Sequence, residues 1–265
     1  MPLLYVTHLH LKGLAPTSIS VHLAAVRALH VVEGFKEPEI RTPQVNLALK
    51  GMLDAHVTTQ RKPIDFNMLT EICDVVSNHS NSSMWLAVLC LAFFAGLRSS
   101  EYCDSGDPEF QGPSVGHVQF AKDKVMYFTV KRSKTKAQGF TVPLGCTKEQ
   151  ICPVCSMIQY LASRKHDGSL RRNAPLFLYR GSALRAGQVN QFIKKVVQVL
   201  GLDPKDYSTH SIRSGAATTA ATVGFKDWEL QKLGGWKSQV YKQYIREVDD
   251  HITGFTTRLT SQTRK

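Results

Sequence analysis

The fold of this chain follows most directly from the stretch Thr209-His-Ser-Ile-Arg-Ser-Gly-Ala-Ala217. His210 and Arg213 are three residues apart, so a helix would place both on one face. Ser208 and Thr209 are residue types that commonly cap the start of a helix. The small residues that follow let a helix approach its neighbours closely. We therefore expect a packed helix that presents an imidazole and a guanidinium together.

A second arginine stands directly behind the most apolar segment of the chain. That segment, Met84–Leu97, is shorter than the roughly 18 apolar residues that span a bilayer, which predicts a buried helix. It runs into Gly96-Leu-Arg-Ser-Ser-Glu101, where Arg98 and Glu101 are three residues apart. Because a planar guanidinium can bind two phosphate oxygens at once, Arg98 and Arg213 are candidates for holding a phosphate.

The composition is basic. The 265 residues include 33 Lys or Arg and 21 Asp or Glu, a formal net charge of +12. A basic domain of this kind most often binds nucleic acid, although a basic surface that only maintains solubility is the alternative. Hydrophobic residues make up 43%, enough for a packed core and contrary to wholesale disorder. The first residues lack the pattern of a signal peptide, so we expect no secretion or transmembrane signal.

Hydrophobic periodicity and turn residues predict a mainly α-helical protein with a small antiparallel sheet, an α+β fold. Helices are expected over residues 15–34, 42–56, 65–76, 83–94, 152–164, 189–200, 209–221, 227–233 and from 238 onward. Strands are expected over residues 118–120, 125–132 and 140–144, with a polar, basic hairpin connection over 133–139. In the second helix, Val45, Leu49 and Leu53 are expected to face inward.

Three further segments carry candidate residues. Lys134 lies in the hairpin segment Arg132-Ser-Lys-Thr-Lys136, Trp236 follows a glycine pair, and Tyr241 and Tyr244 come on the next turns. Each feature alone is common, because such lysines are usually solvated and such aromatic residues usually pack. Attack on a phosphodiester needs a nucleophile, cations on the non-bridging oxygens and an acid for the leaving oxygen. The order of all these segments along one chain makes the pattern specific.

With its segments in this order, the chain resembles the tyrosine recombinases of the phage integrase family over nearly its whole length. The Gly-Gly-Trp236 and Tyr244-Ile-Arg246 segments are similar to those of Cre-like members. Leu49-Lys-Gly51, Arg132-Ser-Lys-Thr135 and the spacing of the last aromatic residues are more similar to recombinases of DIRS-type and Crypton-type mobile elements.

The resemblance implies a site-specific DNA recombinase or integrase that needs neither ATP, nor a metal, nor another cofactor. Tyr244 would attack the scissile phosphate, which gives a 3′-phosphotyrosine and a free 5′-hydroxyl. Arg98 and Arg213 would hold the non-bridging oxygens, and Lys134 would protonate the leaving oxygen. The interval from Trp236 to Tyr244 is one residue shorter than in Cre-like members. Tyr241 is therefore an alternative nucleophile, although the Tyr-Ile-Arg context favours Tyr244.

The remaining roles also come from the resemblance. His210 would hydrogen-bond the phosphate or take the tyrosine proton, Trp236 would donate its indole N–H, and Glu101 would orient the basic groups around it. Other basic residues would contact the DNA backbone and make affinity sensitive to salt. The residues expected to do so are Arg27, Arg132, Lys136, Lys194 and Lys195.

The resemblance also divides the chain into a helical core-binding domain over 1–57, a linker over 58–64 and a catalytic domain over 65–265. The stretch before Gly13 is short for the first core-binding helix, so we expect this domain to be N-terminally incomplete. The implied partners are double-stranded DNA and, through the tail after Arg246, three further copies in a homotetramer on DNA, with no membrane. Localisation would be nuclear in a eukaryotic host and cytoplasmic in a bacterial one.

The six cysteines are too few for a disulfide framework in a chain of this length. Cys152-Pro-Val-Cys155 is a lone CxxC pair. A structural zinc usually needs a second closely spaced pair. Such a pair is not supplied by the other cysteines, which are Cys73, Cys90, Cys103 and Cys146. We therefore expect reduced thiols at a helix start and in the core, and no metal.

Three other functions are compatible with parts of the pattern. A domesticated DNA-binding protein derived from a mobile element would keep the fold without catalysis. A type IB topoisomerase shares the chemistry but relaxes supercoils without exchanging strands. A helical RNA-binding module is the least specific alternative, and it leaves the ordered series of candidate residues unexplained.

Overall fold

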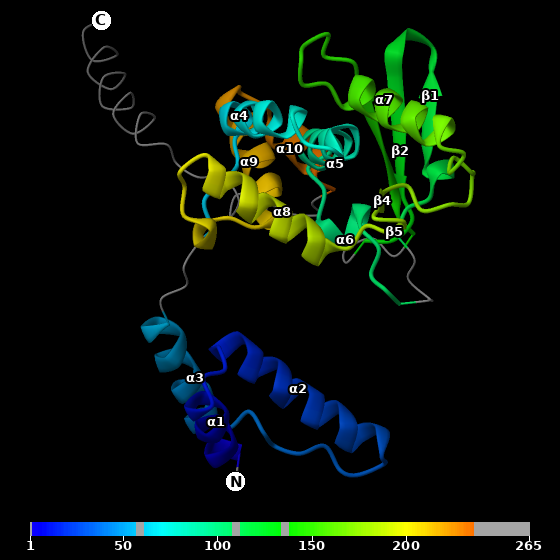
Figure 1. Cartoon of the computed structure of the whole chain (residues 1–265). Coiled ribbons are helices and arrows are strands. Elements are labelled where there is room, and N and C mark those ends of the chain that lie inside the picture. The colour runs from blue at the N-terminus through cyan, green and yellow to red at the C-terminus, as the bar shows by residue number, and fades with distance from the viewer. Residues whose placement is uncertain (1, 57–60, 108–111, 134–137, 236–265) are drawn as a thin grey trace, which may run out of the picture. The chain divides into compact units, whose positions relative to one another are not determined.

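The computed structural model describes residues 2–56, 61–107, 112–133 and 138–235 (Figure 1). Its backbone forms two compact units, Met1–Gln60 and Arg61–Lys265. Among the described residues, no helix combines the length and apolarity needed to cross a membrane.

The first unit is a small helical bundle. Its helices are α1 (Pro2–Leu11), α2 (Pro16–Val32) and α3 (Pro43–Ala55). Proline at the first position suits both α2 and α3, since its missing N–H would have no partner there. Thr42 caps α3 by accepting a hydrogen bond from the Val45 N–H at 3.3 Å. The hydrophobic core of this unit is formed by Val6, Leu9, Ile19, Leu23, Ile40, Val45 and Leu49.

Two details of this unit differ from the expectations. A helix forms over α1, where none was expected. The prediction that Leu53 faces inward is wrong, because its side chain is 46% exposed. The helical repeat of 3.6 residues turns Met52 rather than Leu53 toward the core that Val45 and Leu49 form.

The second unit holds the larger core. Its α-helices are α4 (Phe66–Ser77), α5 (Ser82–Phe94), α6 (Ser99–Tyr102), α7 (Pro153–His166), α8 (Ala186–Val199), α9 (Thr209–Thr222) and α10 (Asp227–Leu233). Short 3-10 helices cover Val115–His117, Lys122–Lys124 and Pro204–Asp206. The helices expected between residues 65 and 233 are confirmed to within two or three residues at most ends, and the helix expected from 238 onward lies outside the described residues.

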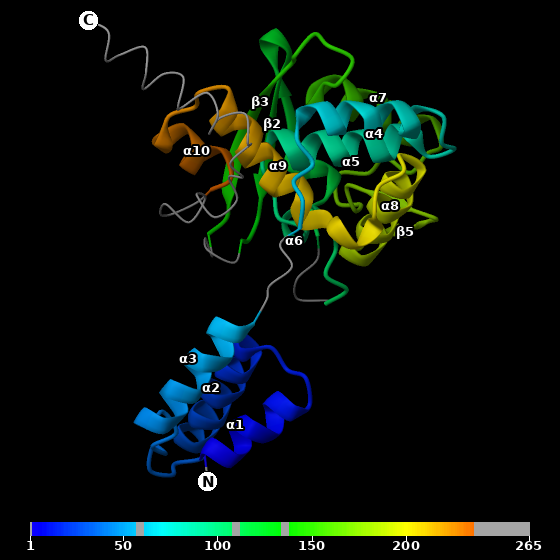
Figure 2. The ribbon, with the colours of Figure 1, turned by 90° about the vertical axis from the view of Figure 1, so that its left-hand side faces the viewer.

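Helix α5 is the centre of this unit. Nearly all of its side chains from Met84 to Phe93 are buried, as expected for a helix that is apolar on every side. It packs against α4, α7 and α9 (Figure 1). Figure 2 shows α9 extending from α10 toward α8, so the small-residue helix crosses the unit.

A three-stranded antiparallel sheet flanks the helices. It contains β1 (Val118–Ala121), β2 (Val125–Val130) and β3 (Phe140–Gly145) in that order, which confirms the expected strands. The β2–β3 register runs from Val125 opposite Gly145 to Val130 opposite Phe140. On β2, alternate residues are buried: Met126, Phe128 and Val130. A two-stranded ribbon, β4 (Leu178–Tyr179) with β5 (Ser182–Ala183), lies elsewhere in the unit.

Glycine is required where α9 meets the segment that leads into α4. The Ile64 N–H donates to the Ser211 carbonyl at 2.9 Å, so this backbone lies directly on α9. A Cβ at Gly215 would collide with the Ile64 carbonyl group. The small residues of the HxxR stretch therefore serve a close approach between a helix and a backbone segment.

Candidate active site

The first arginine segment starts where α5 ends. Gly96 has φ of +55°, in the left-handed region where glycine avoids the cost of a Cβ. The Gly96 N–H donates to the Phe93 carbonyl and the Leu97 N–H to the Ala92 carbonyl, both at 2.9 Å, which satisfies the last turn of α5. The chain then reverses, and Arg98 becomes the residue that precedes α6.

Glu101 is the hub of the polar network around Arg98. Its side chain is fully buried, and its Oε1 accepts from the Arg98 Nη1 at 2.9 Å while its Oε2 accepts from the Arg98 backbone N–H at 2.8 Å. The Ser133 hydroxyl donates to the same Oε1 at 2.7 Å, and Arg98 Nη1 also reaches Ser133 Oγ at 3.3 Å. A buried carboxylate is stable only when it is paired in this way. The network thus fixes Arg98 against the segment that follows β2.

Arg213 approaches the same carboxylate from α9. Its side chain is 1% exposed, and its Nη1 lies 4.0 Å from Glu101 Oε2. Nη1 also donates to the Gly96 carbonyl, and Nη2 donates to the Gly234 carbonyl at 3.0 Å. Arg213 thereby joins the loop after α5 to the glycine pair after α10. The close packing of Gly96 against Gly234, where a Cβ on Gly96 would lie 3.4 Å from Gly234 Cα, is consistent with this role.

The two arginines share a cavity with His210. The cavity has a volume of about 210 Å³, and it is lined by Leu97, Arg98, Ser99, Ser100, Thr209, His210 and Arg213. His210 lies in the first turn of α9, where its backbone N–H is capped by the Ser208 hydroxyl at 3.2 Å. Its side chain is exposed, whereas that of Arg213 is buried. The structure therefore brings together three of the residues expected from sequence, with Glu101 behind them.

The other expected catalytic residues lie outside the described part of the chain. These are Lys134, Trp236, Tyr244 and the alternative nucleophile Tyr241, and the expected DNA contact Lys136 lies there too. Tyr102 lies within the described residues, on α6 close to the site, and also carries a phenol. Burial raises its pKa well above the usual range, and its side chain is only 1% exposed. Tyr102 is therefore a neutral core residue that DNA does not reach.

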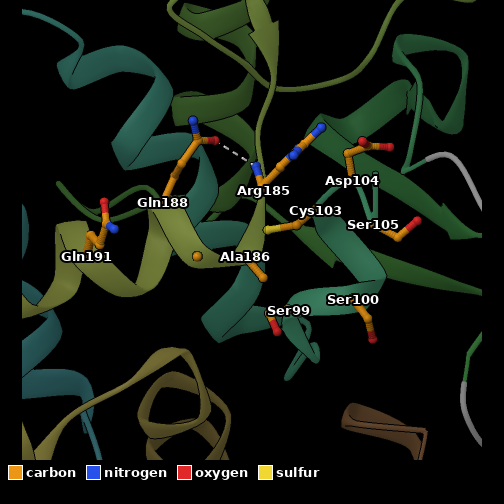
Figure 3. A pocket seen from close by; sticks show the side chains of 10 residues that line it. Ser99, Ser100, Cys103, Asp104, Ser105, Arg185, Ala186, Gln188 and Gln191 are labelled. Atoms are coloured by element: carbon orange, nitrogen blue, oxygen red, sulfur yellow. Dashed lines mark hydrogen bonds between the residues drawn. The ribbon is translucent and has the colours of Figure 1, made fainter. Parts of the chain in front are cut away.

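A second cavity adjoins the first along α6. Its volume is about 470 Å³, and Ser99 and Ser100 line both cavities. Figure 3 shows these two serines on one side and Arg185 and Asp104 on another. The Arg185 backbone N–H donates to Gln188 Oε1 at 2.9 Å at the start of α8. The cavity thus combines hydroxyls, a guanidinium and a carboxylate beside the start of α8.

Sequence reasoning missed Arg185 and Ser133 as site residues. Arg185 immediately precedes an amphipathic helix, and its place in the lining of this cavity is evident only once the helix is placed in the fold. Ser133 adjoins Lys134 in the basic hairpin segment, and its proximity in sequence to a candidate residue was the available signal.

The basic residues expected to contact DNA belong to several elements of the two units. Arg27 is exposed on α2 and forms an ion pair with Glu37. Arg132 is exposed just beyond β2, which ends at Val130 rather than Arg132. On α8, Lys195 is exposed and Lys194 is half-buried. Exposure alone does not test contact with DNA, so these expected contacts stay predictions.

The cysteines lie partly as expected and partly not. All six are free of disulfides, with Cys152 at the start of α7 and Cys73, Cys90 and Cys103 in the core. The expectation that the CxxC pair stands alone is wrong, because the Cys146 sulfur lies 3.6 Å from the Cys152 sulfur.

Comparisons with known proteins agree with the geometry. The model of the phage integrase family matches residues 62–251. Among solved structures, XerA recombinase is 17% identical with a TM-score of 0.57, over 96% of this chain and 78% of XerA. The Tn1549 transposon integrase in complex with circular intermediate DNA is 13% identical with a TM-score of 0.60, over 92% of this chain and 79% of that one.

A lambda integrase dimer bound to a COC′ core site is 17% identical with a TM-score of 0.58, over 91% of this chain and 62% of the integrase. At these identities the likeness to solved structures concerns the fold. Among curated protein sequences, no significant match was found.

Proposed function

The chain belongs to the phage integrase family and has the tyrosine recombinase fold, and we propose that it cleaves and rejoins DNA strands as a site-specific recombinase or integrase. The observation that carries the proposal is the convergence of Arg98, Arg213 and His210 on one cavity. These residues come from the connection between α5 and α6 and from the first half of α9, which are far apart in the sequence.

The charge balance of the cavity favours a phosphodiester as its occupant. Arg98 and Arg213 supply two positive charges, and Glu101 supplies one negative charge. Among the described residues, these three groups leave one positive charge at a site where Arg213 is buried and Arg98 is partly accessible. A phosphodiester carries a single negative charge, and two guanidinium groups can bind its non-bridging oxygens through charge-assisted hydrogen bonds. The same bonds would stabilise the extra charge that develops as the phosphorus is attacked.

The proposed reaction is a transesterification. The Tyr244 phenol oxygen attacks the scissile phosphorus, a P–O bond to tyrosine forms, and the bond to the DNA 5′-oxygen breaks. His210 hydrogen-bonds the phosphate or takes the phenol proton, and Lys134 gives a proton to the departing 5′-oxygen. Trp236 donates its indole N–H to the phosphate. Because one phosphodiester replaces another, the scheme requires neither ATP nor a metal ion.

Rejoining is the reverse reaction with another strand. A 5′-hydroxyl from a second duplex attacks the phosphotyrosine and releases Tyr244, which exchanges the strands. We further propose that four copies assemble on DNA through the tail after Arg246. Exchange between duplexes distinguishes this proposed activity from that of a type IB topoisomerase, which reseals the original strand.

Covalent trapping from a random pool tests the proposal whatever the target sequence is. The full chain is incubated with nicked duplexes of random sequence, in which the fragment carrying the leaving 5′-hydroxyl diffuses away. SDS-resistant adducts are then recovered and their DNA is sequenced. We expect wild-type adducts with an enriched sequence, no adduct from Tyr244→Phe, and adducts from the matched variant Tyr241→Phe.

The other outcomes separate the alternatives. Adducts from Tyr244→Phe but none from Tyr241→Phe would identify Tyr241 as the nucleophile. DNA binding without any adduct would show a catalytically silent DNA-binding protein. If the protein relaxes a supercoiled plasmid that carries the enriched site but exchanges no strands between two duplexes that carry it, the activity is that of a topoisomerase.

A further inference from the structure

Three cysteine sulfurs meet at the junction between the sheet and α7. Cys146 directly follows β3, Cys152 immediately precedes α7, and Cys155 lies in the first turn of that helix. The Cys146 sulfur is 3.6 Å from the Cys155 sulfur and 3.6 Å from the Cys152 sulfur. All three sulfurs lie within 4.8 Å of one another. They are therefore the corners of one small triangle.

The size of this triangle matches a metal site. Zinc binds thiolates at about 2.3 Å, which places two sulfurs of a tetrahedral site about 3.8 Å apart. The measured separations of 3.6 Å are close to this value. They are much longer than the roughly 2.05 Å bond of a disulfide. One zinc ion can therefore bind all three sulfurs with little movement, whereas a disulfide would pull two of them together and leave the third.

The connection between the cysteines is built to hold them in place. Lys148 has φ of +61°, a conformation uncommon for a residue with a side chain, and it reverses the chain between Cys146 and Cys152. The Thr147 hydroxyl donates to the Ile151 carbonyl at 2.9 Å and accepts from the Glu149 N–H at 3.2 Å. The loop is thus ordered by its own hydrogen bonds.

The surroundings also suit a metal with thiolate ligands. The Cys155 N–H donates to the Cys152 sulfur at 3.3 Å, a hydrogen bond of the kind that orients and stabilises a ligating thiolate. Cys152 and Cys155 lie at the start of the 14-residue helix α7, where the helix dipole favours negative charge. Cys152 is buried, while Cys146 and Cys155 are accessible to solvent. A water molecule can therefore reach the fourth position.

We propose that Cys146, Cys152 and Cys155 bind one zinc ion, with water as the fourth ligand, and that the ion fastens the end of β3 to the start of α7. None of the three cysteines lines the cavity that holds Arg98 and Arg213. The proposed ion therefore lies apart from that cavity, and strand cleavage in the proposed function would remain independent of metal chemistry.

Metal analysis of the full chain tests this site directly. The protein is purified under reducing conditions without chelator and then loaded with zinc, and bound metal is measured by elemental analysis after dialysis. We expect one zinc ion per chain, and most of it lost in Cys146→Ser and Cys155→Ser. The matched control is Cys73→Ala, which removes one thiol from the core and should retain the metal. Circular dichroism checks that each variant is folded.

Measurements on the wild-type protein keep the test independent of variant folding. Cobalt loaded in place of zinc should show thiolate-to-metal charge-transfer absorption in the near ultraviolet. Alkylation of Cys146 and Cys155 should be slow in the zinc-loaded protein and fast after chelation. The proposal is overturned if reduced protein binds no zinc, if Cys155→Ser retains it, or if the cysteines instead form a disulfide that excludes the metal.

Discussion

Replacing Glu101 by glutamine should destabilise the catalytic unit far more than the same change at a half-buried glutamate that accepts an equivalent but solvent-exposed hydrogen bond. Glu101 accepts four hydrogen bonds or close polar contacts from Arg98, Ser133 and the neighbouring Arg213, and its side chain is fully buried. Glutamine keeps the shape, but it loses the charge and turns an N–H₂ group toward donors. Breaking a buried ion pair on one side costs about 3–5 kcal/mol, so we expect a loss of that size in the free energy of unfolding.

The matched control is Glu229→Gln. Glu229 Oε2 accepts from the Lys226 N–H at 2.7 Å, which reproduces the bond from the Arg98 N–H to Glu101 at 2.8 Å. The Glu229 bond lies at the surface, so its change should cost about 1 kcal/mol or less. The two variants therefore share the capping bond and differ in the buried guanidinium groups.

Urea unfolding of the full chain, followed by tryptophan fluorescence, measures both effects. All three tryptophans lie in the unit Arg61–Lys265, so the signal reports the unit that contains the network. Sulfate should reduce the difference in unfolding free energy between Glu101→Gln and wild type, because an anion in the cavity compensates the charge of the two guanidinium groups. Equal, small losses in the Glu101 and Glu229 variants would refute the idea that Glu101 holds the arginines together.

Three further predictions concern packing and DNA contact. Gly215→Ala should lower the free energy of unfolding by about 3 kcal/mol, because the added Cβ would collide with the Ile64 carbonyl. The control Gly187→Ala has open space around the added Cβ and should raise the free energy of unfolding by about 0.5–1 kcal/mol. Urea titration measures both variants. Arg164→Lys should cost about 3 kcal/mol in the same assay, since a lysine cannot replace four hydrogen bonds from one buried guanidinium, and an unchanged midpoint would contradict this role. Arg185→Gln should weaken DNA binding and lower the slope of log affinity against log salt by about 1, measured by fluorescence anisotropy, and an unchanged slope would remove Arg185 from the DNA contact.

Local signals in the sequence were sufficient for most of the fold. Asp65 caps α4 by accepting from the Met68 N–H at 2.9 Å, and Gly96 and Gly234 end the helices that precede them, as their residue types predict. The convergence of Arg98 and Arg213 was also predicted, because the resemblance supplied the tertiary relation that spacing alone does not contain.

Features that depend on contacts between distant segments were not predicted. Arg164 is buried because loop carbonyls at residues 169, 175 and 176 gather around it, and no periodicity in α7 indicates this. Cys146 reaches the CxxC pair across a connection in which Lys148 adopts a left-handed backbone conformation, which residue type does not favour. Ser133 bonds to Glu101 across 32 residues of chain. In each case the deciding interaction forms only after the elements have packed.

The most direct test of the account is to locate the DNA–protein bond. Trypsin cleaves after Lys237, Lys242 and Arg246, so it separates Tyr241 and Tyr244 into different peptides. Covalent adducts are digested with nuclease and trypsin, and mass spectrometry identifies the peptide that carries the residual nucleotide. We expect the nucleotide on the peptide 243–246, attached through a 3′-phosphate to Tyr244. A nucleotide on any other residue, or on a 5′-phosphate, would contradict the proposed chemistry.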